Sequence, residues 1–419
     1  MSRTAPVLHF CPEQRFSCRR CGFCCANFEV TATAEEIRHI AKLSIPELPT
    51  PIESCFSPLK GNLSTIVKDP SKRCRFMDGD GLCLIHRHGG AEAKPLACRL
   101  YPFNIHVWTD GHISADLRFI CPAVGDPDGQ RTGDQAGHIR EIAALMGKTE
   151  KPADTCYSES NPAGLAQVRC VHEGIKAIIY NDALPFALRL YAAVKILDFH
   201  ASPEMRTAIS AANGDFKTDA ADFAIKAAPL LARELEGVAP LPLRERIDFR
   251  SLIGGYLRDD SSSSAGSRFS RMWHFVAFGL GKGSLQQINA SCPDTRGIDC
   301  LECSRLAAMS PEAAEQYRNF FHGKLESMHF CSRYAHHYTY ELGLRHLLLT
   351  APVAFSLAAA FAAAERSPSV DASHMRRVLT YIDTTFSLSP YFRRTATRRL
   401  LGRLTVPATF AALLKGRLT

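Results

Sequence analysis

The segment FSCRRCGFCCANFEV, residues 16–30, carries four cysteines in a tight pattern. Two residues separate Cys18 from Cys21 and Cys21 from Cys24, and Cys25 follows directly. Gaps of two residues let neighbouring thiolates converge on one metal centre. Adjacent residues point their side chains apart, so Cys24 and Cys25 serve two centres or one of them is a spare. The segment therefore predicts a small domain organised around a metal.

Four further cysteines downstream extend this pattern. Cys74 and Cys83 bound CRFMDGDGLC, Cys98 lies in ACRLYPF, and Cys121 precedes a proline. The two groups together supply eight thiolates, enough for two four-ligand centres or for one centre with spares. The run C-x2-C-x2-C also opens the bacterial iron–sulfur pattern, whose last cysteine precedes proline. The match is partial, because Phe28 occupies the local fourth position.

Cysteine accounts for 16 of the 419 residues, and ten of the 16 precede residue 122. A chain of this length has ample core for two or three domains and needs no disulfide staples. The first 16 residues lack the apolar segment of a secretory signal, so we expect a cytoplasmic protein with reduced thiols. Metal or redox chemistry is then a better interpretation of the cysteines than disulfides.

Soft thiolate ligands suit both iron–sulfur clusters and zinc. The sequence favours an iron–sulfur cluster, of the 4Fe–4S type, over zinc. Buried cysteines without a metal are ordinary for one or two residues, but they explain eight at these spacings poorly. Arginines near the cysteines offer counter-charge for either kind of centre. These are Arg19, Arg20, Arg75, Arg87 and Arg99.

The segments FSCRRCGFCCANFEVTATAEEI, KRCRFMDGDGLCLIH and KPLACRLYPF resemble the bacterial CxxCxxCC (YkgJ-like) family of zinc- or iron-chelating proteins, over residues 16–121. Met77 replaces a leucine of the family pattern, His86 a tyrosine, and Lys94 an arginine. His86 is an extra ligand or, as we favour, a packing residue. The resemblance implies eight metal ligands: Cys18, Cys21, Cys24, Cys25, Cys74, Cys83, Cys98 and Cys121.

A second cysteine group predicts a second metal site, with fewer true ligands as the alternative. It comprises Cys292, Cys300 and Cys303 in CPDTRGIDCLEC, together with Cys331. A long helix is expected from Pro311 toward residue 347, after the cap Ser310. His322, His329 and His336 recur in it every seven residues, which places them on one stripe. We interpret that stripe as satisfied histidines rather than a pocket.

Helical periodicity dominates after residue 135, and strand signals are few. The predicted fold class is mainly α, with a small irregular cysteine-rich metal-binding domain followed by an all-helical domain. Thr33 and Glu36 form a capping-box pattern within the first part, and a Pro/Gly/Asp-rich linker follows Cys121. The expected divisions are the cysteine-cluster domain 11–122, a helical region 135–257, a Ser-rich loop 258–270, a helical region 271–390 with the second cysteine group, and a basic tail 391–419.

The uncharged run LLLTAPVAFSLAAAFAAA, residues 347–364, reaches the length of a membrane span. Eight alanines and a proline weaken that interpretation, so we expect a buried core helix and no transmembrane segment. The net charge is +8, and residues 391–419 hold seven bases and no acid. A uniformly basic nucleic-acid surface is therefore not indicated.

The predicted function is cytoplasmic metal-centre binding. QYRNFFHGKLESMHF and LTYIDTTFSLSPYF resemble flagellin lysine-N-methylase-like proteins. That resemblance implies, as an alternative, a cluster-dependent lysine N-methyltransferase that uses S-adenosylmethionine on a flagellin-like substrate. Another alternative is a structural-zinc interaction module whose basic tail binds an acidic partner or a membrane. The GLGKG run lacks a preceding strand and is interpreted as a turn that ends a helix.

Overall fold

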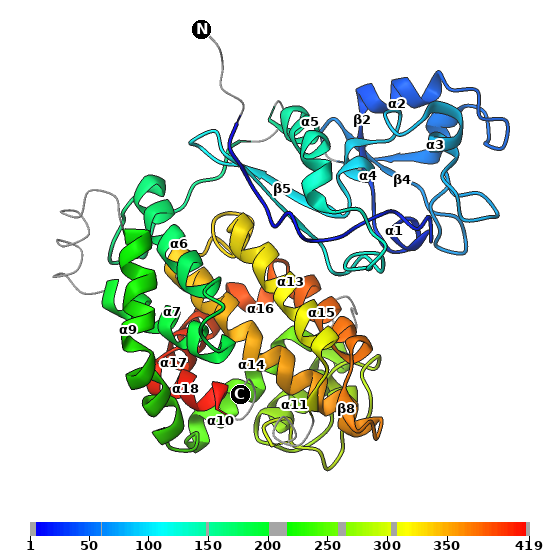
Figure 1. Cartoon of the computed structure of the whole chain (residues 1–419). Helices are drawn as coiled ribbons and strands as arrows, with labels where there is room; N and C mark the ends of the chain where they lie inside the picture. Colours follow the sequence, from blue (N-terminus) through cyan, green and yellow to red (C-terminus); the bar gives the residue numbers. More distant parts are fainter. Residues whose placement is uncertain are drawn as a thin grey trace, which may run out of the picture. The chain divides into compact units, whose positions relative to one another are not determined.

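The computed structural model divides into two compact units, Met1–Pro152 and Ala153–Thr419 (Figure 1). The first unit combines short strands with short helices, and the second is built from helices. The predicted mainly α fold class is thereby confirmed. The structure describes residues 6–59, 61–147, 151–200, 216–258, 265–302 and 308–415.

Two three-stranded sheets lie in the described part of the first unit. In one sheet β4 pairs antiparallel with both neighbours, and in the other β6 pairs parallel with β1 and antiparallel with β5. Strands of two to five residues are too short for alternation to stand out in a sequence, which explains why few strands were expected. The strands are β1 (Leu8–His9), β2 (Thr31–Thr33), β3 (Phe56–Pro58), β4 (Leu63–Ile66), β5 (Phe103–Val107) and β6 (Ile113–Leu117).

The helices of this unit are short. The expected capping box is confirmed, because Thr33 Oγ1 accepts from the Glu36 amide at 3.2 Å and Glu36 Oε2 accepts from the Thr33 amide at 2.7 Å. The second oxygen of the same carboxylate, Oε1, accepts from the amide of Leu96 at 2.6 Å. The helices are α1 (Phe23–Asn27), α2 (Ala34–Ala41), η1 (Ile52–Cys55), α3 (Leu84–Gly89), α4 (Leu96–Leu100), η2 (Thr132–Gln135) and α5 (Ala136–Met146).

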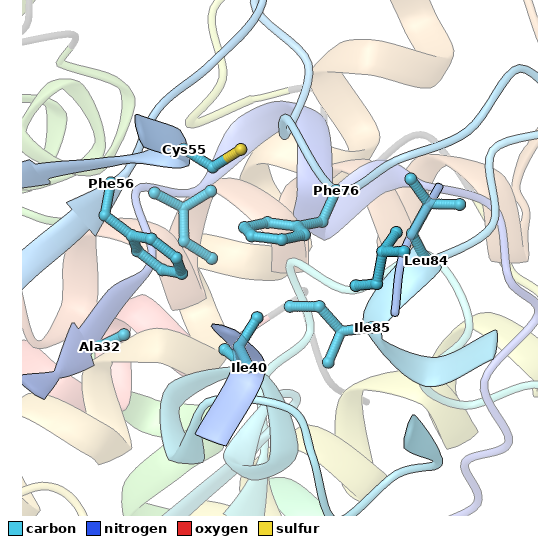
Figure 2. Packing of buried hydrophobic residues seen from close by; sticks show 9 residues of the cluster. Ala32, Ile40, Cys55, Phe56, Phe76, Leu84 and Ile85 are labelled. Atoms are coloured by element: carbon cyan, nitrogen blue, oxygen red, sulfur yellow. The ribbon is translucent and has the colours of Figure 1, made fainter. Parts of the chain in front are cut away.

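A small apolar core lies between the β2–β4–β3 sheet and helices α2 and α3 (Figure 2). The rings of Phe56 and Phe76 meet there at a centroid distance of 5.4 Å, beside Ile40 and Ile85. Cys55 belongs to the same core and behaves as a small apolar side chain. This cysteine was not among the ligand candidates.

The expected linker after Cys121 is instead part of the first unit. The amide of Phe16 donates to the carbonyl of Gln130 at 2.9 Å, and Thr132 Oγ1 donates to the carbonyl of Cys11 at 2.6 Å. Helix α5, grouped from the sequence with the helical region 135–257, also belongs to this unit. The segment after Cys121 has the polar, glycine-rich composition of a linker because backbone hydrogen bonds, not apolar packing, hold most of it in place.

The described part of the second unit packs its helices around α14, which contacts α7, α10, α13, α15 and α17. Two very short strands, β7 (Ala308–Met309) and β8 (Ser369–Val370), pair in parallel. The helices are α6 (Leu165–Ile179), α7 (Phe186–His200), α9 (Phe216–Gly237), α10 (Leu243–Leu257), α11 (Ala265–Gly279), α12 (Leu285–Ile288), α13 (Pro311–Ser327), α14 (Tyr340–Ala364), α15 (Ala372–Phe386), α16 (Pro390–Arg393), α17 (Thr395–Leu404) and α18 (Pro407–Leu414).

Helix α14 contains the uncharged run and is long and apolar enough to cross a membrane by composition alone. In the fold, 89 % of the 18-residue apolar stretch of this helix is buried among the other helices. The prediction of a buried core helix is therefore confirmed. The helical unit also contains a buried ion pair. Lys324 Nζ of α13 and Asp383 Oδ1 of α15 lie 2.7 Å apart, and their side chains are only 3 % and 2 % exposed.

The prediction of one long helix from Pro311 toward residue 347 is wrong. Helix α13 ends at Ser327, and Met328 adopts a left-handed backbone conformation with φ 57°. His336 and His337 are also left-handed, at φ 59° and 55°. The three histidines therefore do not share one helical stripe. An i, i+7 pattern across a tight loop imitates a helix because spacing alone carries no information on backbone handedness.

Two further boundaries are corrected. The Ser-rich loop 258–270 falls partly on 259–264, which lie outside the described residues, and from Ala265 onward the chain is the helix α11. The described part of the basic tail, residues 391–415, is mostly helical, and Arg403 in it pairs with Asp248 at 2.8 Å. The GLGKG run forms the expected turn after α11, with Gly281 and Gly283 at φ 81° and 103°.

Candidate metal centre

Helix α1 presents the adjacent cysteines of the N-terminal segment. Gly22 precedes the helix with φ 69°, and a Cβ there would lie 3.0 Å from Met77 Sδ, so this position favours glycine. The Sγ atoms of Cys24 and Cys25 lie 3.9 Å apart. Two sulfurs bound to one tetrahedral zinc are separated by about 3.8 Å. The argument that adjacent side chains must point apart is therefore wrong here.

Short backbone contacts bring the downstream cysteines to α1. The amide of Cys74 donates to the carbonyl of Cys25 at 3.0 Å. Cys83 pairs with Met77 across a tight turn and caps the N-terminus of α3. Cys98 lies on α4, whose first residue is tied to Glu36. Each cysteine thus comes from a different local structure.

Four of these thiols influence one another's pKa: Cys24, Cys74, Cys83 and Cys98, here called the four-thiol cluster. Burial raises the pKa of Cys74 to about 11, and the thiols of Cys83 and Cys24 add to the shift. Burial also raises the pKa of Cys98, with Cys83, Cys74 and Cys24 contributing in the same direction. The pKa of Cys24 is raised first by its hydrogen bond with Cys25 and then by burial. Crowded thiols disfavour one another's ionisation, and a bound cation reverses that effect.

Tyr101 and Cys121 border the four-thiol cluster. Burial raises the pKa of Cys121, with Cys21 and Cys24 adding to the shift, while a hydrogen bond with Tyr101 opposes it. The Tyr101 hydroxyl is buried without a nitrogen or oxygen partner among the described residues, so the sulfur is its neighbour. The Tyr101 ring packs against Phe28 at 4.9 Å. Only its place in ACRLYPF could have drawn attention to this tyrosine in the sequence.

The positive charge beside the thiols comes mainly from lysines. Lys68 opposes the pKa rise of Cys74 and donates to the carbonyl of Ala26 at 2.6 Å, and Lys94 opposes the rise of Cys98. The arginines expected in this role have carboxylate partners in several cases: Arg19 pairs with Asp126, Arg87 with Asp78 and Arg99 with Glu141. Arg75 interacts with the thiol of Cys55.

The remaining candidates are more exposed. The side chains of Cys18 and Cys21 are exposed, and Cys25 is half-buried. His86 lies on α3 and is largely exposed. Partial desolvation of its ring lowers its pKa, and the charges of Lys94 and Arg20 lower it further. As the side chains stand, no three His, Cys, Asp or Glu residues within the described ranges have metal-binding spacing. The full ligand set therefore stays a prediction.

The second cysteine group is spread over different surroundings. Burial raises the pKa of Cys292 to about 11, and its thiol hydrogen-bonds Tyr381. Burial raises the pKa of Cys331 to about 12, with Thr155 and Cys156 as its neighbours. Cys300 is buried, and Cys303 lies outside the described residues. A second metal site stays a prediction.

Comparison with known families identifies the cysteine-rich unit. Residues 17–121 match the CxxCxxCC family model, described as "Putative zinc- or iron-chelating domain". The first part of the chain is a CxxCxxCC domain. The match begins one residue before Cys18 and ends at Cys121, so it spans all eight ligand candidates. Metal chelation is thus the general function of this domain.

The chain is also similar to an uncharacterized protein of Methanocaldococcus jannaschii, with 25 % identity over 109 residues. That stretch is 26 % of this chain and 37 % of the relative, so the chain spans little more than a third of the relative's length. No solved structure matches the chain.

Proposed function

We propose that the CxxCxxCC domain holds a metal centre on the four-thiol cluster. The observation that carries this proposal is the electrostatic influence that Cys24, Cys74, Cys83 and Cys98 exert on one another, since they come from four separate segments and are all partly buried. Buried thiols have little reason to gather unless a cation stabilises their ionised forms. Their soft donors fit iron or zinc better than magnesium or calcium.

Three further thiols adjoin the cluster and are the candidates for a second centre or for ligand exchange. Cys25 contacts Cys24, and Cys21 and Cys121 lie on the side of Tyr101. The finer proposal is an iron–sulfur cluster of the 4Fe–4S type, with zinc on the same thiols as the alternative. An iron–sulfur cluster supplies electron transfer, whereas zinc in a closed four-thiolate site is structural.

The chain's own residues prepare this site. Lys68 and Lys94 supply compensating charge beside Cys74 and Cys98. The rings of Phe28 and Tyr101 cover the side near Cys121. A cytoplasmic location, where thiols stay reduced, is part of the proposal. Methyl transfer with S-adenosylmethionine stays a hypothesis, because no observed contact in the described residues favours it.

Metal analysis of protein purified without oxygen tests the proposal. We expect bound iron with sulfide and visible absorption, or bound zinc without colour. Cys98→Ala should reduce the bound metal, because it removes a buried thiol whose pKa three other thiols raise. Cys55→Ala is the matched control, since Cys55 is buried in the same unit but lies in the apolar core of Figure 2.

Full metal content in Cys98→Ala, at the level of the parent protein, would remove the four-thiol cluster as the site. Equal loss of metal in Cys98→Ala and Cys55→Ala would also contradict the proposal, since it would indicate general unfolding of the unit. Circular dichroism of both variants distinguishes these outcomes.

A further inference from the structure

The thiols of Cys24 and Cys25 lie against each other on α1. Their Sγ atoms are 3.9 Å apart and share a hydrogen bond, and both residues are half-buried. A tetrahedral metal ion takes four ligands, and the four-thiol cluster supplies four thiols, with Cys24 as one of them. Cys25 is therefore a surplus thiol at this centre, in direct contact with a proposed ligand. We call Cys24 and Cys25 the adjacent thiol pair.

Helix α1 can accommodate a change of backbone at the adjacent thiol pair. The helix has five residues, none of them is fully buried, and no side chain caps its N-terminus, where Gly22 has φ 69°. On the other side of the pair, the carbonyl of Cys25 accepts from the amide of Cys74 at 3.0 Å. The carbonyl of Ala26 accepts from Lys68 Nζ at 2.6 Å. A local rearrangement before Cys25 thus breaks few hydrogen bonds and leaves the following segment anchored.

A disulfide between two adjacent cysteines is strained. Consecutive Cα atoms are about 3.8 Å apart, whereas the Cα atoms that an ordinary disulfide joins are about 4.4–6.8 Å apart. Strained disulfides are reduced more easily than structural ones, and they serve as labile or regulatory bonds. A bond between Cys24 and Cys25 would therefore be reversible, unlike a structural cross-link.

We propose that the adjacent thiol pair is a modification site, at which a peroxide closes a Cys24–Cys25 disulfide and thereby releases the metal from the four-thiol cluster. The inference rests on the proposed function, since it requires Cys24 to be a metal ligand. The thiolate is the form of cysteine that binds a metal, and a sulfur in a disulfide carries no such charge. Closing the bond therefore takes one of four ligands from the centre, while the other three cysteines remain thiols.

The reaction balances with one peroxide and two thiolates. The Cys25 thiolate attacks one oxygen of hydrogen peroxide, the O–O bond breaks and hydroxide leaves, which gives a sulfenic acid on Cys25. Cys24 Sγ then attacks that sulfur, so that the S–S bond forms, the S–O bond breaks and a second hydroxide leaves. Both hydroxides take protons from the solvent and become water. Each sulfur gives up one electron, peroxide accepts the two electrons, and a dithiol reductant reverses the reaction.

Peptide mapping of the full chain, purified without oxygen, tests for the bond. Trypsin cleaves after arginine, so residues 21–38 form one peptide, which carries Cys21 and the adjacent thiol pair. After treatment with hydrogen peroxide this peptide should lose two hydrogens while Cys21 still reacts with an alkylating agent, and a dithiol should restore it. A bond from Cys18 to Cys21 would instead join this peptide to a neighbouring one. That result overturns the inference, and so does a peptide without any new bond.

Release of metal is the second readout, measured as a fraction of the metal that each protein holds before treatment. Peroxide should release most of the metal from the parent protein, and a dithiol with added metal should restore it. Cys25→Ser should release its metal on the order of tenfold more slowly, because the thiol that directs the oxidation to Cys24 is absent. Cys170→Ser, which removes a half-buried thiol of α6 in the second unit, should release metal as the parent does.

The outcomes separate this inference from the proposed function. Metal that stays bound while the Cys24–Cys25 bond forms overturns the inference and leaves the metal centre standing, and so does release from Cys25→Ser at the parent rate. A parent protein that holds no metal after reconstitution refutes the proposed function and the release step together. The mapping of the bond is informative in either case, because the oxidation itself needs no metal.

Discussion

The two units are stabilised in different ways, and the contrast is sharpest between α1 and α14. Helix α14 has 25 residues, nearly all buried, whereas α1 and α4 have five residues each and none that is fully buried. Helices this short do not persist alone in water. They nevertheless carry Cys24, Cys25 and Cys98. The segments that present these three thiols therefore have no fully buried residue, and under the proposed function a bound metal would take the place that packing has in the second unit.

Removal of the metal should produce the largest difference in stability between the two units. Structural metal sites contribute on the order of 10 kcal/mol, comparable with the whole stability of a domain. After chelation or acid release of the metal, residues 11–122 should lose amide protection while α14 keeps it. Hydrogen exchange measured by mass spectrometry reports both units in one sample. Equal protection of α1 and α4 before and after removal would show that packing suffices.

Within the helical unit, the largest single effect should come from the buried ion pair. Lys324→Met leaves Asp383 charged and without its partner in the core, which costs about 3–5 kcal/mol. The double variant Lys324→Met/Asp383→Leu should recover most of that loss, because it removes both charges. Urea unfolding followed by helical circular dichroism measures each value. A double variant as unstable as the single one would mean that packing, not charge, causes the loss.

The contrast between the units also separates what the sequence reveals from what it hides. The capping box at Thr33 and the buried run of α14 were predictable, because caps and long apolar runs are local signals. The end of α13 was not predictable, since the spacing of the histidines contains no information on the left-handed backbone of Met328.

The candidate metal centre, too, was predictable from the sequence only in part. The eight candidate cysteines could be named from spacing and family resemblance, and the family model spans them. Their grouping could not, because the segments that carry Cys24, Cys74, Cys83 and Cys98 are far apart along the chain and are connected through turns and bridges. Tyr101 and Lys68 were missed for a similar reason, since neither carries a metal-ligand signature in the sequence.

Acid should weaken the helical unit through its buried histidines. Burial, and then Arg318, lowers the pKa of His322 to about 4 from 6.5. The unfolded chain therefore binds more protons between these values, and stability falls as the pH drops below about 6.5, by up to about 1.4 kcal/mol per pH unit for each such histidine. His322→Phe should reduce the slope between pH 7 and 5. An unchanged slope would exclude His322 as a contributor.

The smallest expected effect concerns the hydroxyl beside Cys121. Tyr101→Phe removes one hydrogen bond, worth about 1 kcal/mol, and keeps the ring that packs on Phe28. The variant should retain its metal but show a shifted absorption band or reduction potential. Tyr180→Phe, in the second unit, is the control. An identical spectrum for Tyr101→Phe would place the hydroxyl outside the electronic surroundings of the centre.

One carboxylate joins two parts of the CxxCxxCC domain that are 60 residues apart along the chain. Glu36 accepts from the amide of Thr33 with one oxygen and from the amide of Leu96 with the other. The N-terminus of α2 and the helix α4, which carries Cys98, therefore depend on the same carboxylate. Replacing Glu36 by a residue without a side-chain oxygen leaves both amides without this acceptor, whereas a substitution at position 96 keeps its amide donor unless the new residue is proline. A glutamine at position 36 offers only one acceptor oxygen, so a chain with that residue would have to choose between the two helices.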